Sequence, residues 1–569
     1  MMADPAVAAP LQIRVDLPAP LAAYAEPPSR LAATLCQAIE QGVVELAATL
    51  GVPARPVAHI TPSVVPDGGI AIRMIVGERR LLASNELLQR VYSDVCGEPL
   101  SPLTTPDVIV ASMAQETASA ASQNGSPAVE VLAHACVEAL KQEPAVLFGS
   151  DQARSYAARL RAPQRREDEA ASTARPYDSE WLREVLGGVL NLGISIADHD
   201  TVATVLAAAL AGPSQSAAVI EDLIGALRPN VFEIRVPRAF LRELTTGDSD
   251  PASMFPFLRQ GMFTELGIEL PAIRFVAVEA LKPRTFCFRL NHLTSVPLRG
   301  LSPGQLLVND THERLALMRI NATATLNPAT WQPASIVDGS PASELQEAGL
   351  TTWNAMQHIV LCLADHLRQT SHALVHREWV HGQLQKLRLA VPTLLSTVRE
   401  RWSDDDLTGL LRALVREGVS IRNGRRILER LAELGVVRWE PTSNARRDRA
   451  LAHPVAFVRA GLGHEIVYKA ARQTNTVVVY LLDAGVERTA MEPVVSVQDH
   501  DAILRACHAE FAQLPPTAMR PSLLTIVEAR QPLVDLLRAA IPRLSVLAHE
   551  ELPPGTNVQP VARITVTGQ

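Results

Sequence analysis

One pattern occurs twice in the sequence, in residues 178–210 and again in residues 403–435. In the second segment, aliphatic residues at i, i+3, i+4, i+7 and i+8 predict one apolar face of a helix. These residues are Leu407, Leu410, Leu411, Leu414 and Val415. We expect Gly418 to end this helix and Asn423 to cap a second one. The segment therefore predicts a compact helix–turn–helix unit.

The first segment repeats this unit at a constant spacing, with Leu407 following Leu182 by 225 positions. The other aliphatic residues of the first stripe are Val185, Leu186, Val189 and Leu190. The glycine that ends the first helix recurs at Gly193, and the residue that caps the second helix recurs at Asp198. The short segment between the two helices recurs at Ser195 and Ile196. Unrelated amphipathic helices often share a stripe, but they rarely share all of these features without a gap. The spacing therefore predicts an internal duplication.

The elements upstream follow the same order in both halves. The predicted strand 232–236 (FEIRV) corresponds to 13–17 (IRVDL), and each is followed by a helix that a glycine ends, at Gly267 and at Gly51. We therefore predict two tandem copies of one module, residues 1–228 and 229–440.

The predicted fold class is a multidomain mixture of α+β and α/β, because 569 residues are too many for one core. After residue 446, strands alternate with helices, which predicts a small and partly parallel sheet. The expected divisions are an α+β region over residues 1–160, a linker over 161–177, a helical subdomain over 178–228, a second α+β region over 229–400, a second helical subdomain over 401–440 and a C-terminal α/β subdomain over 446–569.

Composition excludes some partners. The net charge of -7 gives no general attraction to nucleic acid or to anionic membranes. No apolar run reaches the roughly 18 residues needed to span a bilayer, and the first thirty residues lack the pattern of a signal peptide. The six cysteines contain no C-x-x-C pair and are typical of buried free thiols. We expect a cytoplasmic protein that neither binds nucleic acid nor inserts into membranes.

Few residues indicate a catalytic, cofactor or metal site. His372 and His376 are spaced to share one helix face and to bind a metal, with His358, His366 and His381 nearby. No Glu stands in an H-E-x-x-H frame, however, and exposed helix histidines are the more common case. Gly461 and Gly463 lack the third glycine of a dinucleotide fingerprint, and Asp404 to Asp406 suit a helix N-terminus. We therefore predict no catalytic, cofactor or metal site, and no enzyme.

Two clusters of arginines remain as a candidate contact surface for an acidic partner. The first, which we predict as the partner-binding patch, consists of Arg422, Arg425, Arg426 and Arg430. The second consists of Arg446, Arg447 and Arg449. Neither is interleaved with aromatic residues, which argues against nucleic acid as the partner.

Several motifs resemble the FHIPEP family, the large export-gate component of flagellar and injectisome type III secretion. A helix ending in E-L-G-I, at Glu265 to Ile268, precedes a P-x-I-R strand that begins at Pro271. A P-G-x-L-L turn follows at Pro303. The most specific match to the family is L-x-x-E-G-V-S-I-R-N, from Leu414 to Asn423.

The resemblance concerns the cytoplasmic domain, since no segment here matches the family's membrane-spanning half. It implies α+β subdomains assembled into a homo-oligomeric ring that docks chaperone and cargo proteins. We therefore expect a protein–protein interaction scaffold. Two alternatives stay open: a regulatory effector or enzyme built on the same fold, and an accessory protein that docks on a separate membrane export gate.

Overall fold

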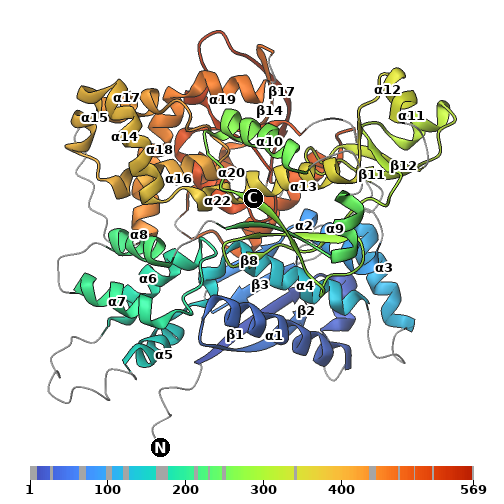
Figure 1. The fold of residues 1–569 in the computed structure, drawn as a ribbon, viewed down its shortest axis with the longest axis horizontal. Helices are drawn as coiled ribbons and strands as arrows, with labels where there is room; N and C mark the ends of the chain where they lie inside the picture. Colours follow the sequence, from blue (N-terminus) through green and yellow to red (C-terminus); the bar gives the residue numbers. More distant parts are fainter. Residues whose placement is uncertain are drawn as a thin grey trace, which may run out of the picture.

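The computed structural model arranges the chain as several α/β lobes around a central region (Figure 1). It describes residues 9–25, 30–62, 72–77, 79–97, 106–119, 127–161, 177–210, 216–227, 231–245, 251–338, 342–434, 444–471, 474–492, 494–515, 518, 520–541 and 543–566. The predicted linker, residues 161–177, falls almost entirely outside the described residues.

The first lobe contains a four-stranded sheet in the order β2-β1-β3-β4. Its strands are β1 (Ala9–Leu17), β2 (Ala54–Pro62), β3 (Ile72–Val76) and β4 (Arg79–Ala83). β1 is parallel to β2 and antiparallel to β3, and its residues Ile13 and Val15 are completely buried. Two long helices, α1 (Arg30–Leu50) and α4 (Pro127–Gln142), pack together on this sheet.

Two further helices lie between β4 and residue 127, α2 (Asn85–Cys96) and α3 (Pro106–Ser119). α2 buries only a narrow stripe that includes Leu87, Leu88 and Val91 within a polar sequence, so periodicity indicates it weakly. Ser84 caps α2 by accepting a hydrogen bond from the backbone N–H of Leu87.

A helical lobe follows the first sheet. Its helices are α5 (Ser150–Arg161), α6 (Ser179–Leu190), α7 (His199–Leu210) and α8 (Ser216–Leu227). Asp178 caps α6, and Asp198 accepts a hydrogen bond from the backbone N–H of Thr201. The predicted apolar stripe of α6 is buried throughout.

The second sheet has the order β6-β5-β7-β8, with β5 parallel to β6 and antiparallel to β7. Its strands are β5 (Phe232–Val236), β6 (Ile273–Ala277), β7 (Thr285–Leu290) and β8 (Leu293–Thr294), and β9 (Leu298–Arg299) also pairs with β7. Two helices, α9 (Arg238–Thr245) and α10 (Pro251–Leu266), lie between β5 and β6 in the chain. The parallel and antiparallel pairings match those of the first sheet.

A small sheet projects beside the second one, at the right of Figure 1. Its order is β11-β12-β10-β13, and it has its own core around Val308, Leu315 and Val337. The elements are β10 (Gln305–Val308), α11 (His312–Leu317), β11 (Ala322–Leu326), β12 (Pro333–Asp338), α12 (Ala342–Glu347) and β13 (Thr352–Trp353). The sequence did not predict this sheet, since its strands are short and separated by polar turns.

The second helical lobe comprises α13 (Ala355–Thr370), η5 (Ser371–Leu374), α14 (Arg377–Ala390), α15 (Pro392–Arg399), α16 (Asp404–Arg416) and α17 (Gly424–Glu433). Ser403 and Asp406 form the predicted capping box at the start of α16, and Asn423 caps α17 as expected. Of the predicted stripe on α16, Leu407, Leu410, Leu414 and Val415 are buried and Leu411 is half-buried. The second helix, α17, buries Ile427, Leu428 and Leu431.

The C-terminal lobe contains a fully parallel sheet in the order β16-β15-β14-β17. Its elements are α18 (Asn444–Gly461), α19 (Gly463–Ala470), β14 (Thr476–Leu482), α20 (Ala484–Met491), α21 (Val497–Ala512), β15 (Ser522–Thr525), α22 (Val527–Leu537), β16 (Val546–Ala548), η6 (His549–Glu551) and β17 (Asn557–Ile564). The first two helices of this lobe, α18 and α19, meet at Leu462.

Candidate docking surface and central cavity

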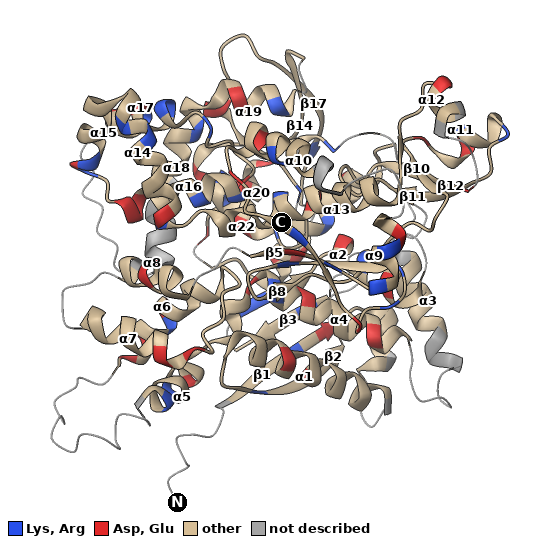
Figure 2. Cartoon of the chain, in the orientation of Figure 1, with Lys and Arg blue, Asp and Glu red and all other residues tan. Residues whose placement is uncertain are grey.

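The arginines of the predicted partner-binding patch lie along α17 and the turn before it (Figure 2). Arg425 and Arg426 both pair with Glu429, at 2.8 and 3.4 Å. Arg430 pairs with Glu433 and stacks on Phe457, with 3.9 Å between the guanidinium carbon and the ring centroid. Arg425 is the most exposed of these three, with 70% of its side chain accessible.

Arg422, the remaining member of the patch, lies over the ring of Phe263 in α10, at 5.9 Å from the centroid. Its guanidinium is therefore held by a cation–π contact with another helix. The side chains of Arg446, Arg447 and Arg449, the second basic cluster, lie outside the described residues.

Three elements meet where this contact is made: the C-terminal half of α10, the start of α17, and α19. Lys469 of α19 donates hydrogen bonds to Glu265 of α10 at 3.2 Å and to the carbonyl of Gly418 at 3.0 Å. Asn423 donates to Glu465 of α19 at 2.9 Å. The three elements therefore form one continuous surface.

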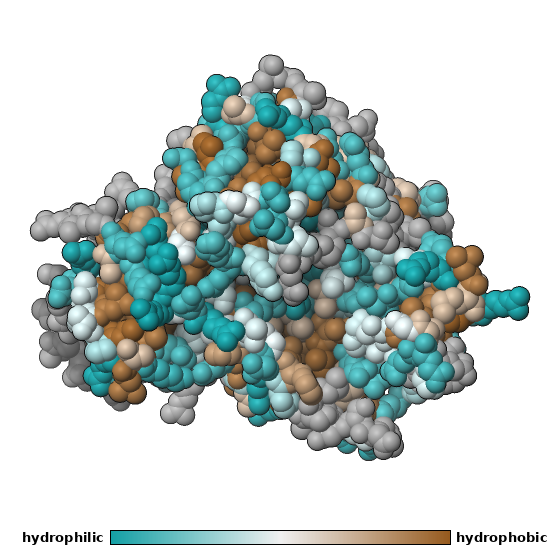
Figure 3. All heavy atoms as spheres, turned by 90° about the horizontal axis from the view of Figure 1, so that it is seen from above, coloured by the Kyte–Doolittle hydropathy of each residue, from teal (hydrophilic) through white to brown (hydrophobic). Residues whose placement is uncertain are grey.

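This surface combines aromatic rings with positive charge. Phe257 of α10 is 83% exposed and Tyr468 of α19 is 59% exposed. We call Phe257, Phe263, Arg422, Arg425 and Tyr468 the docking surface. Figure 3 shows the molecule from above, with patches of hydrophobic residues among hydrophilic ones. Exposed aromatic residues next to arginine are typical of protein interfaces.

Below the docking surface, a buried ion network joins the second helical lobe to the C-terminal lobe. Arg459 donates to both oxygens of Glu551 at 2.6 and 2.9 Å, and to Glu417 at 3.0 Å. Arg530 donates to the same Glu417 oxygen at 2.7 Å. Burial tends to raise the pKa of Glu417, but Arg459 and Arg530 outweigh it and hold that pKa below its usual value.

A second buried carboxylate, Asp365 of α13, joins three lobes. It accepts hydrogen bonds from Arg90 of α2 and from Arg543, which precedes β16. Both guanidiniums lie 4.9 Å from the ring centroid of Trp331, in the turn between β11 and β12. Trp331 has a φ of 59°, a conformation that few non-glycine residues adopt.

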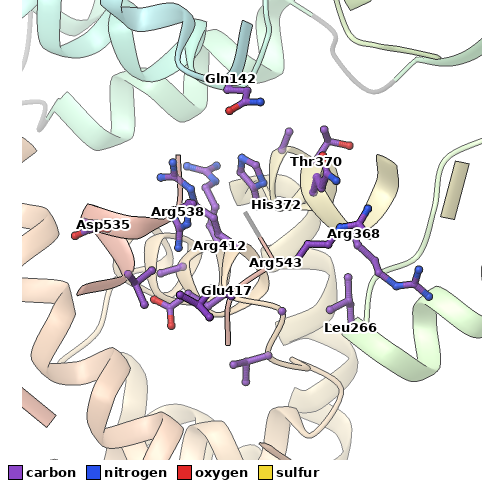
Figure 4. A pocket seen from close by; sticks show the side chains of 18 of the residues that line it. Gln142, Leu266, Arg368, Thr370, His372, Arg412, Glu417, Asp535, Arg538 and Arg543 are labelled. Atoms are coloured by element: carbon purple, nitrogen blue, oxygen red, sulfur yellow. The ribbon is translucent and has the colours of Figure 1, made fainter. Parts of the chain in front are cut away.

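A large cavity of about 2790 Å³ lies between the lobes. It is bounded by α4, α6, α13, α16, α22 and the strand edges beside them. Its lining includes 14 Lys or Arg residues and 11 Asp or Glu residues, whereas the whole chain is negative. The wall of the cavity is thus more basic than the rest of the protein. Figure 4 shows Arg412, Arg538 and His372 reaching into the open space from one side.

The histidines do not form the arrangement that a metal would need. His372 lies in η5 and His376 precedes α14 as its N-cap, so the two do not share a helix as the sequence predicted. Burial lowers the pKa of His372 to about 3. Within the described ranges, no group of three metal-ligating side chains is found. All six cysteines are free thiols, and Cys136, Cys287, Cys362 and Cys507 are buried.

The residues that connect the lobes are mostly ones that sequence patterns cannot single out. Arg459 and Asp365 stand in no motif, and each contacts a partner from a distant region of the chain. Glu417 lies within the E-G-V-S-I-R-N signature, and that motif was the one sequence signal for this network.

Membrane-spanning helices were searched for among the described residues, and none of the helices there is both long and apolar enough.

Comparisons with known proteins match a little more than half of this chain. The chain is 25% identical over 344 residues to the hypersensitivity response secretion protein HrcV of Ralstonia nicotianae, covering 57% of this chain and 47% of HrcV. It is 22% identical over 327 residues to the flagellar biosynthesis protein FlhA of Treponema pallidum, covering 55% of this chain and 44% of FlhA. The chain thus spans about half the length of the curated relatives it matches.

A solved structure shares the fold. The Chlamydia pneumoniae CdsV protein superposes with a TM-score of 0.53 at 22% identity, covering 59% of this chain and 98% of that structure. The FHIPEP family profile matches residues 221–557. This match includes more than half of the sequence, and the chain therefore belongs to the FHIPEP family.

Proposed function

We propose that this protein is a non-enzymatic scaffold that docks soluble protein partners, chaperones or their cargo, at the docking surface in the cytoplasm. The observation that carries the proposal is the Arg422–Phe263 contact, made on the helix that also carries exposed Phe257 and beside the helix that carries exposed Tyr468. Arg425 adds an accessible positive charge. A partner helix with apolar residues on one face and acidic residues at its edge would complement this surface.

Proteins similar to this chain support a role in protein docking. Their names describe components of secretion and of flagellar biosynthesis. CdsV, which shares the fold over 59% of this chain, was also solved in complex with a protein named CdsO. Partner binding through this region of the fold is therefore a reasonable expectation for this chain.

The proposal includes the duplication, with residues 1–228 and 229–440 as two copies of one module. The same hydrogen bond occurs in both proposed copies, which supports the duplication. In the first, the N–H of Ile196 donates to the carbonyl of Leu50 at 2.9 Å, and in the second, the N–H of Ile421 donates to the carbonyl of Leu266 at 2.9 Å. The neighbouring Gly51 and Gly267 have φ values of 75° and 78°.

Two further details agree with a duplication. Ser195 and Ser420 both accept a hydrogen bond from the backbone N–H two residues later, at 3.2 and 3.3 Å. The two large sheets share their pattern of parallel and antiparallel pairing. Such repeated local geometry is difficult to explain by convergence of two unrelated sequences.

The contact between the modules supports assembly into a ring. The helical subdomain of the first module meets the β7–β8 turn of the second: Gly193 accepts a hydrogen bond from the N–H of His292 at 3.0 Å, and Leu192 accepts one from Asn291 at 3.0 Å. This contact joins different surfaces of two similar modules. Head-to-tail contacts of this type generate rings when the rotation closes.

Light scattering on the purified chain tests the ring. At tens of micromolar we expect a mass that is a multiple of 61.5 kDa. A mass of one chain across this concentration range would contradict the ring, while leaving the docking surface to be tested separately.

A photo-crosslinking amino acid placed at Phe257 tests docking in living cells. Leu389 of α14 is the matched control, since it is apolar and 86% exposed but lies outside the docking surface. We expect crosslinks to chaperone or secretion proteins from position 257 and few from position 389. Arg422→Glu with Arg425→Glu should abolish these crosslinks, and Arg388→Glu should not. Equal crosslinking from both positions would overturn the proposal.

A further inference from the structure

At one end of the central cavity, basic side chains converge from three elements that are distant in sequence. Arg412 and Arg416 lie one turn apart on α16, Arg538 follows the last residue of α22, and His372 lies in η5. All four line the cavity. Figure 4 shows the guanidiniums of Arg412 and Arg538 beside the imidazole of His372, with Gln142 across the open space.

The carboxylates nearby are largely committed to other partners. Arg412 donates to Glu221 of α8 at 3.0 Å and to the carbonyl of Val375 at 2.9 Å. Glu417 accepts from Arg459 and Arg530 of the buried ion network. Within the described stretches of the chain, Arg416 and Arg538 form no ion pair.

The environment of Arg538 is unfavourable for its charge. Burial, and next the positive charge of Arg416, lower the pKa of Arg538 to about 10, although Glu417, Asp535 and Glu143 act in the opposite direction. Holding two like charges together in a partly buried site has a free-energy cost that an anion would remove.

His372 adds a neutral polar group to this site. Burial is the main cause of its low pKa, and the charges of Arg416, Arg538 and Arg412 lower it further, which places the imidazole within electrostatic range of all three. Its Nδ1 is buried and has no hydrogen-bond partner among the described residues. At neutral pH this ring is therefore uncharged and has a free polar atom.

We propose that Arg412, Arg416 and Arg538, with His372, bind a phosphate-bearing small molecule at this end of the cavity. Guanidinium groups match the oxygens of phosphate with paired, charge-assisted hydrogen bonds. Three guanidiniums grouped around one end of a cavity suit a compact polyanion better than an extended acidic peptide, which needs charges spaced along a line. The cavity exceeds the roughly 300–1,000 Å³ of ordinary ligand sites, so a nucleotide fits as well as free phosphate.

The site has a structural consequence that the docking proposal does not include. Arg412 contacts α8 of the first module through Glu221, whereas Arg538 belongs to the C-terminal lobe. A ligand held by both residues would link these lobes through the cavity, and its binding would stabilise their arrangement.

Equilibrium dialysis of the full chain with radiolabelled ATP, and separately with inorganic phosphate, tests the proposal. We expect saturable binding of at least one probe, weakened about tenfold or more by Arg538→Met and again by adding Arg416→Met. Arg520→Met is the matched control, because Arg520 lines the same cavity but stacks on Phe511 at 4.9 Å. Unchanged far-UV circular dichroism establishes that each variant is folded.

The two probes separate the sources of phosphate. Tighter binding of ATP identifies a nucleotide site, and equal binding identifies a site for the phosphate group alone. Either result supports the proposal if the binding is weakened by Arg538→Met and not by Arg520→Met. Binding of neither probe, or an equal effect of all three variants, would overturn it. So would an Arg538-dependent preference for a glutamate-rich peptide over both probes, which would assign the site to a protein segment instead.

Discussion

Arg459 and Glu551 form a bidentate ion pair in the interior of the protein, with only 4% and 2% of their side chains accessible. The pair connects α18 to η6, two elements separated by 92 positions in the chain. Arg459 also pairs with Glu417 just after α16, so that one guanidinium joins three elements. The position of the C-terminal lobe against the second helical lobe depends on these contacts.

We therefore expect Glu551→Gln to be strongly destabilising, since it leaves two buried guanidiniums, Arg459 and Arg530, with Glu417 as their one shared carboxylate. Removing one partner of a buried pair typically lowers the free energy of unfolding by about 3–5 kcal/mol. Denaturant unfolding followed by circular dichroism measures this change. Glu429→Gln, which breaks the exposed pair with Arg425, is the control and should cost about 0–1 kcal/mol. Similar losses in both variants would contradict the assigned role.

Gly267 is expected to tolerate no side chain. Its φ is 78°, and a Cβ there would lie 2.4 Å from the backbone N of Arg422, next to the hydrogen bond between Leu266 and Ile421. Gly304 has a φ of 80° but nothing within 4 Å of a Cβ. Gly304→Ala therefore measures the backbone strain, about 1 kcal/mol, and Gly267→Ala should cost about 1–3 kcal/mol more because of the clash. Thermal unfolding of the two variants checks the difference.

His358 should make stability depend on pH. The imidazole is buried against Phe286, and burial lowers its pKa from 6.5 to about 4. Between these values the unfolded chain binds a proton that the folded chain does not, so stability is fully present above pH 6.5 and is lost as the pH falls toward 4. The full effect is roughly 3 kcal/mol.

His358→Leu tests this pH dependence, measured as the free energy of unfolding at several pH values from 7 to 4. We expect a shallower slope than in the wild type, although not a flat one, because burial lowers the pKa of His366 and His372 in the same direction. An unaltered slope in His358→Leu would show that this ring titrates normally.

Sequence patterns predicted correctly the helices and caps that depend only on neighbouring residues. The stripe from Leu407 to Val415, the capping box of Ser403 and the cap of Asn423 all depend on residues within one or two turns, and the structure has them as expected. The parallel pairing of β14, β15 and β16 also followed from the alternation of strands and helices.

Features that depend on distant partners were beyond these rules. Periodicity cannot indicate that Trp331 lies between arginines from two other lobes, or that Arg412 and Arg538 share a cavity. Periodicity also does not indicate the break between α18 and α19, because the helical pattern continues across it. There Gly463 lies so close to the carbonyl of Glu551 that a Cβ would be 2.3 Å from it.

Asp365 of α13 connects the first lobe to the rest of the protein through its ion pair with Arg90. It is 4% exposed and is the only ion-pair partner of Arg90 among the described residues, whereas Arg543 also pairs with Glu86 of α2 at 3.7 Å. Asp365→Asn would leave the two guanidiniums together over Trp331 without their shared carboxylate. We expect a loss of about 1–3 kcal/mol, concentrated where α2 contacts the rest of the protein.

Hydrogen–deuterium exchange localises this effect. Exchange should increase in α2 and in the turn that carries Trp331, and should increase further in Asp365→Asn with Glu86→Gln, because the second change removes the remaining carboxylate of Arg543. Asp338→Asn, at an exposed position in β12, is the control and should leave both segments unchanged. If exchange rose evenly over the whole chain instead, Asp365 would contribute to global stability and not to holding α2 in place.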